Sequence, residues 1–329
     1  MKILIANDTI IPVHYYGGTE RVIWYLGKEL VKLGHEVSYL VKKGSTCDFA
    51  RIIPLDNARP IDQQIPVDID LIHFHTTWEH MDRINQPYVV TMHGNGDDTM
   101  APLNINTIFV SQNHAQRFGS TSFVYNGLDW NDYSPFAKNA KREYFHFLGN
   151  AAWRIKNVQG AIDLIQLTRF EKLKVLGGVR FNLNMGWRFT FTSRVGFIRK
   201  VGAKTKDKLL NHSKGLIFPV RWHEPFGLAI IESLYYGCPV VGTPYGSLPE
   251  LVNKQIGFLS IHKSELLQAL ENIQAFDSVL CHETALENFN SRKMAMAYLE
   301  KYSRVMDGDK LNILNPRKIH ADRSLLDWD

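Results

Sequence analysis

The sequence contains few cysteines, and their spacing fits none of the common cysteine-based sites. Cys47, Cys238 and Cys281 are far apart and odd in number. Disulfide frameworks use cysteines in even numbers, and zinc sites often contain Cys-x-x-Cys pairs. The pattern therefore argues against a disulfide scaffold or a zinc site and favours a reducing compartment, so we expect a cytoplasmic protein.

Long apolar runs are missing as well. No apolar segment is long enough to span a membrane. The apolar run at residues 1–6 is too short for a signal peptide and leads directly into a folded pattern, so it predicts a first β-strand. The chain has 329 residues, of which 45% are hydrophobic and 22% are charged. This composition is typical of soluble proteins, and the length favours two domains over one core.

Acidic residues are scarce in one segment. The net charge of the chain is only +5, but residues 171–215 contain eleven Lys or Arg and only two acids, Glu171 and Asp207. Such a face attracts anionic nucleotides, anionic lipid or acidic glycans, or is simply solvated. One expectation is peripheral contact with an anionic membrane, at the inner face of the plasma membrane. We expect no nucleic-acid partner.

A strand, a glycine turn and a helix open the first half of the chain. Strands are predicted at 1–8 and 36–41, a helix at 21–33, and the turn contains Gly17 and Gly18. Paired glycines let backbone N–H groups approach a phosphate or a sugar, although the GxGxxG spacing of dinucleotide sites is lacking. Further strands are predicted at 69–75, 89–95, 107–111 and 123–127, and the polar segment 129–142 is predicted to be a linker.

The second half repeats this pattern. Strands are predicted at 144–149, 173–178 and 215–220, with helices after 157 and at 205–212. Ser264 is predicted to cap a helix at 266–273, and one long helix is predicted at 285–305. The sequence therefore predicts an α/β protein with a Rossmann-like domain at 1–137, a second at 138–288 and a helix plus tail at 289–329. The two doubly wound domains are expected to face a central cleft.

The most informative stretch follows the strand at 215–220. Pro225 disfavours a helical conformation at Glu224, and a short helix over 228–236 precedes Gly237 and Pro239. Loops at the carboxyl ends of parallel strands bind ligands, and a helix N-terminus favours anions. Glu224 and Glu232 are predicted to lie on the order of 10 Å apart, too far to share a proton. The alternatives are a plain helix start with two acids, or the two ends of a nucleotide diphosphate sugar site.

A metal site is not expected from the remaining polar residues. His73, His75 and His93 lie on or near strand ends, but no carboxylate or cysteine completes a familiar ligand set. Contact between His93 and a ligand by a hydrogen bond is the favoured interpretation. The Asp68-Ile69-Asp70 segment has the DxD form of metal-dependent sugar transferases, but it leads into a buried strand and is interpreted as a turn.

Several short motifs follow one another along the chain. The most specific is Glu224-Pro-Phe-Gly-Leu-Ala-Ile-Ile-Glu232, and the others are Gly17-Gly18-Thr19-Glu20, Thr91-Met92-His93-Gly94, Asn126-Gly127-Leu128-Asp129 and Gly246-Ser247-Leu248-Pro249-Glu250. Together they resemble the retaining glycosyltransferases of family 4, which have the GT-B fold. The resemblance covers roughly residues 1–302. It implies that the last helix, from Phe289 onward, crosses back onto the N-terminal domain.

The resemblance implies a role for each matching residue. Glu232 would hydrogen-bond the ribose of the donor, and Glu224 would contact sugar hydroxyls near the anomeric carbon. His93 would lie beside the transferred sugar. The remaining implied donor contacts are backbone groups at Phe226, Gly227 and Leu228, the closing glycines Gly17 and Gly18, and the base-binding loop at Val201 and Gly202.

One position departs from the family pattern. The family places an arginine directly after the glycine of the second domain's first strand and a lysine about five residues later, and both bind the diphosphate. Here Gly149 is followed by Asn150, which is a candidate donor-binding residue, while Arg154 and Lys156 come later. Lys156 fits the lysine role with a small offset, and Arg154 is a candidate replacement for the missing arginine. Positive charge matters here because the leaving diphosphate gathers charge in the transition state.

The sequence therefore predicts a retaining hexosyltransferase that needs no metal or other cofactor. The donor is a nucleotide diphosphate sugar, with a UDP-sugar favoured and GDP-mannose as the alternative. The acceptor is a saccharide or lipid-linked hydroxyl in surface polysaccharide or glycolipid synthesis. Catalysis is assigned to His93, Glu224, Lys156 and Arg154. Two other functions remain open: a GT-B epimerase or phosphorylase, and a non-catalytic nucleotide-sugar binding protein.

Overall fold

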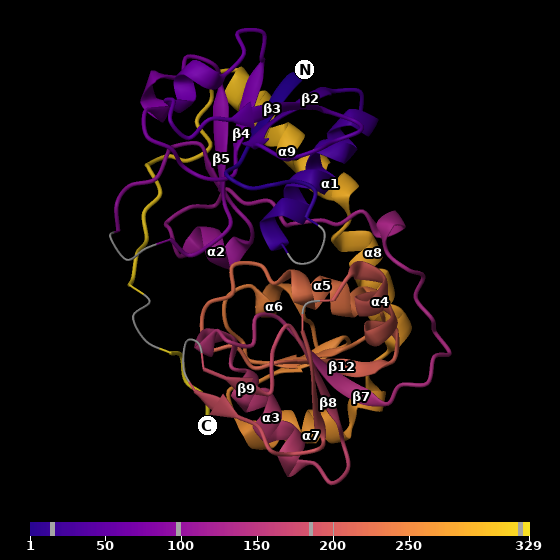
Figure 1. The fold of residues 1–329 in the computed structure, drawn as a ribbon. Helices are drawn as coiled ribbons and strands as arrows, with labels where there is room; N and C mark the ends of the chain where they lie inside the picture. The colour runs from indigo at the N-terminus through magenta and orange to yellow at the C-terminus, as the bar shows by residue number, and fades with distance from the viewer. Residues whose placement is uncertain (14–16, 97–99, 184–186, 200, 322–324) are drawn as a thin grey trace. The chain divides into compact units, whose positions relative to one another are not determined.

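The computed structural model describes residues 1–13, 17–96, 100–183, 187–199, 201–321 and 325–329. The chain forms two compact units (Figure 1). Unit 1 comprises Met1–Asp129 and Phe289–Ala321, and unit 2 comprises Trp130–Asn288 and Asp322–Asp329. The chain thus passes from unit 1 to unit 2 after Asp129, whereas the sequence prediction placed this boundary at 137/138. The prediction also kept 289–329 together, but these residues are divided between the two units.

Unit 1 is built on a six-stranded parallel sheet. In the described residues, the strand order is β3-β2-β1-β4-β5-β6. The strands are β1 Lys2–Ala6, β2 Glu36–Lys42, β3 Arg51–Leu55, β4 Leu71–Phe74, β5 Tyr88–Met92 and β6 Thr107–Phe109, and the helices are α1 Gly18–Lys32, α2 Gln112–Gln116 and α9 Ser291–Met306. Short 3-10 turns occur at Ile61–Gln64 and Met81–Arg83. Helices α1 and α9 pack against each other within this unit.

Unit 2 contains a second six-stranded parallel sheet, ordered β11-β8-β7-β12-β13-β14 over the described part of the chain. Its strands are β7 Tyr144–Leu148, β8 Leu173–Leu176, β11 Val195–Ile198, β12 Ser213–Phe218, β13 Val240–Gly242 and β14 Gly257–Leu259, with a separate ribbon of β9 Phe181–Asn182 and β10 Arg188–Phe189. The helices are α3 Val158–Leu167, α4 Ala203–Asn211, α5 Leu228–Tyr235, α6 Leu248–Leu251, α7 Lys263–Glu271 and α8 Ser278–Asn288. Short 3-10 turns lie at Trp130–Asp132, Arg154–Lys156 and Ile273–Ala275.

The two sheets have the same topology. In each sheet, the first strand lies in the middle, the second and third strands follow on one side of it, and the fourth strand lies on its other side. The first and fourth strands are therefore neighbours: β1 pairs with β4, and β7 pairs with β12. The strand order reverses at this pair, which is the topological switch point of the sheet. Ligands of doubly wound proteins bind at this point, outside the carboxyl ends of the strands. In unit 2, the loops after β7 and β12 therefore lie side by side.

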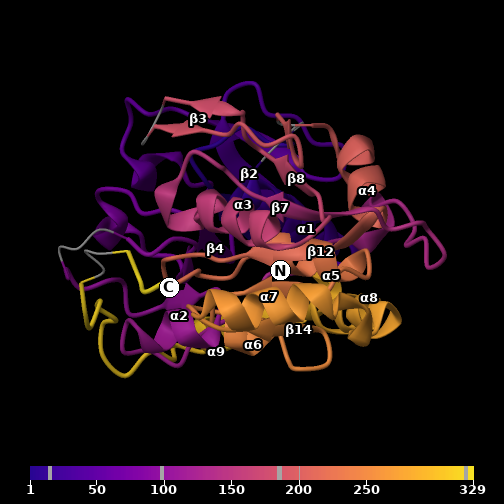
Figure 2. The same cartoon turned by 90° about the horizontal axis from the view of Figure 1, so that it is seen from below.

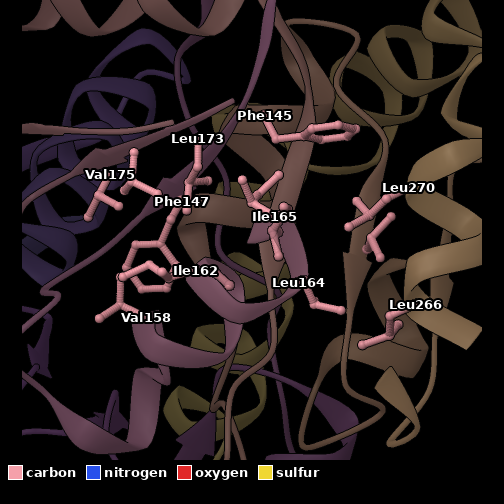
Figure 3. Close-up of a cluster of buried hydrophobic side chains, with 14 of the residues drawn as sticks. Phe145, Phe147, Val158, Ile162, Leu164, Ile165, Leu173, Val175, Leu266 and Leu270 are labelled. Atoms are coloured by element: carbon pink, nitrogen blue, oxygen red, sulfur yellow. The ribbon is translucent and has the colours of Figure 1, made fainter. Parts of the chain in front are cut away.

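Alternation along the central strands of unit 2 divides its two faces. Phe145 and Phe147 of β7 point into an apolar cluster that also contains side chains of α3 and α7 (Figure 3). His146, between them, points to the other face and lies 2.8 Å from the Ser233 hydroxyl on α5. Helices α3 and α7 thus cover one face and α5 covers the other, as expected for strands buried on both sides.

The segment predicted to be a free linker is anchored to unit 2. Trp130 stacks on Tyr235 of α5 with ring centroids 4.4 Å apart and planes only 5° apart. The backbone N–H and the hydroxyl of Ser134 both donate to Asp207 Oδ2 at 3.1 Å. Arg142 donates to the carbonyl of Tyr236 at 2.9 Å. These contacts explain why the boundary between the units falls before this segment and not after Ala137.

Three local predictions were wrong. Ser264 lies inside α7, whose N-cap is His262, because the helix begins one turn earlier than its apolar pattern shows. The long helix predicted at 285–305 is two helices, α8 and α9, and the side chain of Asn290 caps the second by accepting from Lys293 N at 2.8 Å. The strand predicted at 123–127 contributes only an isolated bridge between Phe123 and Phe109.

Candidate active site

Glu224 lies in the loop between β12 and α5, and tight backbone packing holds this loop. Gly227, with φ of +88°, ends the loop in a left-handed conformation at the N-cap of α5. Gly246 has φ of +67°, and a Cβ atom there would lie 2.2 Å from the backbone nitrogen of Glu224. Ser247 N donates to the Glu224 carbonyl at 2.9 Å. Only glycine at position 246 permits this approach, which holds the backbone of Glu224 in place.

The carboxylate of Glu224 is buried and paired with a cation. Its Oε2 atom forms an ion pair with Lys156 and accepts from Trp222 Nε1 at 2.9 Å. The ammonium of Lys156 also lies 4.6 Å from the centroid of the Trp222 ring. Lys156 follows β7 and Glu224 follows β12, so the ion pair joins the loops after the two central strands, where the strand order reverses. The structure thus joins two residues that the sequence assigned separately.

A second buried carboxylate, that of Glu232, is held in a similar way. It lies on α5, is 2% exposed and forms an ion pair with Lys206 of α4. Tyr133 donates to Glu232 Oε1 at 3.1 Å, and its ring lies 5.3 Å from the Lys206 ammonium. Sequence analysis missed Lys206, Tyr133 and Trp222. Lys206 follows the predicted base-binding loop by one helical turn, but no sequence signal shows that it reaches α5.

The other predicted donor-binding residues of unit 2 lie at helix starts. Phe226 is buried, and its carbonyl accepts from the Ser247 hydroxyl at 2.6 Å. Gly227 has no side chain to cap α5, so the N–H groups of the first turn, from Leu228 onward, point out of the helix end. Val201 and Gly202 precede α4, and a Cβ atom at Gly202 would meet nothing within 4 Å.

The loop after β7 separates the two predicted cations. Asn150 turns back on its own loop, where its Oδ1 atom accepts from Ala152 N at 3.1 Å. Lys156 points to Glu224, whereas Arg154 is exposed and lines a different cavity of about 520 Å³ together with Arg188 and Arg221. Neither Lys156 nor Glu224 lines that cavity. A role for Arg154 at the donor phosphates therefore stays a prediction.

His93 belongs to unit 1, beyond the end of β5. Its Nε2 atom lies 2.8 Å from Nδ1 of His75, and burial lowers the pKa of His93 to about 4, so its imidazole is neutral at pH 7. Both rings line a cavity of about 530 Å³ whose wall also includes Thr77 and the buried Lys318. Among the residues that the structure describes, Nε2 of His75 is buried and has no hydrogen-bond partner.

Gly17 and Gly18 lie at the start of α1 in unit 1. Gly17 is the N-cap, Gly18 is the first helical residue, and a Cβ atom at Gly17 would lie 2.5 Å from Glu20 Oε2. The neighbouring residues Tyr15 and Tyr16 of the predicted glycine turn lie outside the described residues. The glycines permit a close approach to the α1 end, and a role in donor closure stays a prediction.

The predicted turn at the DxD segment is confirmed. Asp68 forms an ion pair with Lys2 at 2.9 Å, and Asp70 accepts from the backbone nitrogen of Lys2 at 2.7 Å, directly before β4. His73 lies 2.7 Å from both Tyr302 and Thr91, so each of its ring nitrogens has a partner. Over the residues that the structure describes, no group of three His, Cys, Asp or Glu is arranged to hold a metal ion.

The helices give no sign of a membrane span. Within the described ranges, every helix is too short or too polar to cross a bilayer.

Comparison with solved structures identifies the fold. The chain is similar to AviGT4, a glycosyltransferase involved in avilamycin A biosynthesis, with a TM-score of 0.76 and 20% identity over 93% of this chain and 98% of that one. It is also similar to a sucrose-phosphate synthase from Thermosynechococcus elongatus, with a TM-score of 0.70 and 17% identity over 94% and 100% of the two chains. The Anabaena protein Alr3699/HepE, solved with UDP-glucose, gives 0.62 and 19% over 92% and 99%. The chain therefore has the GT-B fold, with two Rossmann-like domains.

Sequence comparison is informative for unit 2. No curated protein matches the chain. One matched range includes all four residues of the two acid–lysine pairs, and also Tyr133. Residues 130–275, which form most of unit 2, match the family model for glycosyl transferases group 1.

Proposed function

We propose that this protein is a retaining hexosyltransferase that uses a nucleotide diphosphate sugar and requires no metal ion. A UDP-sugar is the favoured donor, and the acceptor is a hydroxyl of a saccharide or lipid-linked saccharide in surface polysaccharide or glycolipid synthesis. The family match over residues 130–275 supports a glycosyltransferase. The choice of UDP is supported by the similar Anabaena protein, whose structure contains UDP-glucose.

The observation that carries the proposal is the pair of acid–lysine contacts in unit 2. Glu224 with Lys156 and Glu232 with Lys206 lie on either side of the first turn of α5. A nucleotide diphosphate sugar has hydroxyl groups at both ends and anionic phosphates in the middle. Carboxylates accept hydrogen bonds from hydroxyls, whereas cations and a helix N-terminus bind phosphates. The carboxylates on either side of the helix N-terminus thus follow the same order as the hydroxyls on either side of the phosphates in the donor.

Each residue then has a role in the transfer. Glu232 accepts from the ribose hydroxyls, and Glu224 orients the sugar near its anomeric carbon. Lys156 and the N–H groups of Gly227 and Leu228 stabilise the negative charge that develops on the leaving diphosphate. Because Lys156 is paired with Glu224, a bound diphosphate must share or replace that ion pair. The acceptor hydroxyl attacks from the side of the leaving group, and a phosphate oxygen takes its proton.

His93, in unit 1, has a proposed role of its own. A neutral imidazole donates one hydrogen bond and accepts another, so it binds a sugar hydroxyl without adding charge. The low pKa of His93 keeps it neutral down to about pH 4. The cavity that it shares with His75 and Lys318 is the proposed place for part of the sugar or the acceptor.

Nucleotide binding provides the first test. Thermal-shift measurements with UDP, GDP, ADP and their sugars should show a selective shift with one base, since a ligand stabilises only the folded state that binds it. Glu232→Gln should then raise the Kd of that nucleotide about 10- to 100-fold, because a hydrogen bond to a charged group contributes about 1.5–3 kcal/mol. Exposed Glu271, on α7 of the same unit, provides the matched control: Glu271→Gln should leave the Kd unchanged.

Sugar transfer provides the second test. With simple glycosides as acceptors, Glu224→Gln should lower kcat about 100-fold or more while the nucleotide Kd changes little. The product should keep the anomeric configuration of the donor in NMR spectra, and EDTA should leave the rate unchanged. Full activity of Glu224→Gln would refute the site. A change in donor stereochemistry without acceptor would identify an epimerase, and binding without turnover would identify a binding protein.

A further inference from the structure

The β9–β10 ribbon of unit 2 turns its apolar face to solvent. Its antiparallel register pairs Phe181 with Phe189 and Asn182 with Arg188. Side chains in a strand alternate between faces, so Phe181 and Phe189 share one face with the residues two positions away, Leu183, Trp187 and Phe191. These five apolar side chains are 53%, 49%, 65%, 81% and 84% exposed, respectively. The ribbon can be followed in Figure 2, where its strands are short arrows coloured between magenta and orange.

The opposite face of the ribbon is polar and faces the protein. Asn182 and Thr190 are buried, at 7% and 4% exposure. Arg188 donates to the Val179 carbonyl at 3.0 Å and lies 4.8 Å from the centroid of Phe197. Arg180 donates to three carbonyl groups, those of Thr190, Thr192 and Val195. The inner face is therefore held by hydrogen bonds, and the orientation of the ribbon does not depend on hiding its apolar residues.

This arrangement reverses the usual one. An antiparallel ribbon on a protein surface normally buries its apolar face and exposes its polar face. The rings of Phe181 and Phe189 lie 6.0 Å apart, and those of Phe181 and Phe191 also lie 6.0 Å apart, so these three rings form one cluster, and Leu183 and Trp187 extend the same exposed face. We call it the aromatic face, consisting of Phe181, Leu183, Trp187, Phe189 and Phe191. Clustered exposed apolar surface marks an interaction site.

The segment of the chain that contains the aromatic face is basic. From Lys172 to Lys206 the sequence contains nine Lys or Arg and no acid, since Glu171 and Asp207 lie just outside this range. Glu171 is paired with Lys214 at 2.7 Å, and Asp207 is buried. Lys172, Arg199 and Lys204 are exposed. Positive charge in the same segment as exposed Trp and Phe side chains complements a bilayer that has anionic headgroups above an apolar interior.

We propose that the aromatic face inserts into the interfacial region of an anionic lipid bilayer and docks unit 2 on the membrane surface. The aromatic side chains enter the boundary between headgroups and acyl chains, while Arg199 and Lys204 contact the lipid phosphates. The polar inner face of the ribbon stays on the protein. This docking does not depend on the proposed transfer reaction, and it would bring unit 2 to lipid-linked substrates.

Co-sedimentation of the full chain with vesicles tests the proposal. The probes are vesicles of phosphatidylcholine alone and of phosphatidylcholine mixed with phosphatidylglycerol. The chain should bind the mixed vesicles, and salt should weaken binding because the Debye length falls to about 3 Å at about 1 M. The double variant Trp187→Ser, Phe191→Ser should bind at least about 10-fold more weakly, since each buried aromatic contributes on the order of 2 kcal/mol. Both side chains are more than 80% exposed, so folding should be unaffected.

A matched variant and an alternative partner complete the design. Val67 and Ile313 in unit 1 are 96% and 98% exposed, so Val67→Ser, Ile313→Ser removes as many exposed apolar side chains elsewhere and should bind like the wild type. Lys204→Ser, Arg199→Ser should weaken binding to the mixed vesicles. Equal binding of the wild type and the Trp187/Phe191 variant would overturn the proposal. Absence of vesicle binding, together with dimerisation that this variant abolishes, would also overturn it and indicate a second copy of the chain.

Discussion

Buried His146 makes the stability of unit 2 depend on acid. Its Nδ1 atom lies 2.6 Å from Ser213 Oγ and its Nε2 atom 2.8 Å from Ser233 Oγ. The Ser233 hydroxyl donates to Ala229 O at 2.6 Å, so Nε2–H must donate to Ser233 and Nδ1 must accept from Ser213. One proton on the ring therefore satisfies all three groups. Burial, together with the nearby Arg142 guanidinium, lowers the pKa of His146 to about 3.

The sign and size of the effect follow from this pKa. In the unfolded chain, a histidine has a pKa of about 6.5, so the unfolded state binds the extra proton first as the pH falls. The folded state is thus most stable above about pH 6.5 and loses stability below it. A shift from about 6.5 to about 3 corresponds to a loss of about 2 kcal/mol between pH 7.5 and pH 5 and about 3 kcal/mol by pH 4.

Urea unfolding at pH 7.5 and pH 5 tests this prediction. Tryptophan fluorescence is a suitable signal because five of the seven tryptophans lie in unit 2. His146→Gln should reduce the loss of unfolding free energy between the two pH values by about 2 kcal/mol. Ser233→Ala removes a hydrogen bond but keeps the imidazole, so it should lower stability by about 1 kcal/mol at both pH values. An unchanged pH dependence in His146→Gln would refute the assignment of a neutral, buried His146.

Three further predictions concern packing and chemistry. Gly246→Ala should destabilise unit 2 by about 2 kcal/mol or more in urea unfolding, because the added Cβ atom would meet the backbone of Glu224. Gly308 also has a left-handed backbone conformation but lies in open space, so Gly308→Ala should cost only about 1 kcal/mol. A thiol reagent should modify partly exposed Cys47 first and the two buried cysteines only on unfolding, and labelling of all three at one rate would contradict their burial. Trp130→Ala should cost about 3 kcal/mol by loss of its stacking on α5, and a change below about 1 kcal/mol would show that the segment does not anchor unit 2.

The repeated strand–helix pattern was readable because parallel strands buried on both faces are continuous apolar runs. Most strands and helices of both units lie where this pattern placed them. Helix ends were less predictable. Ser264 resembles a cap, but the helix starts before it, at Lys263, whose backbone N–H donates to the carbonyl of Asp329, far away in the sequence. The break between α8 and α9 depends on Asn290 as a cap inside a segment that is otherwise helical in pattern.

The candidate site was predictable to the extent that its residues lie in short local motifs. Glu224, Gly227 and Glu232 belong to one loop and helix, so their spacing along the chain already determines their relation. The roles of Arg154 and Asn150 were not predictable in the same way, because the conformation of the loop after β7 decides where each side chain points. That loop directs Lys156 to Glu224 and Arg154 to a different cavity.

By itself, the sequence determined the class of fold, the two acids around α5 and the basic segment that lacks acids, because each is a property of spacing or composition. Only the tertiary structure decided which cations meet those acids and which face of the β9–β10 ribbon meets solvent. Lys206 reaches Glu232 from a different helix, and Lys156 reaches Glu224 from the loop that follows the neighbouring strand β7. The aromatic face has the alternation of an ordinary half-buried strand pair, and alternation does not specify which side is buried.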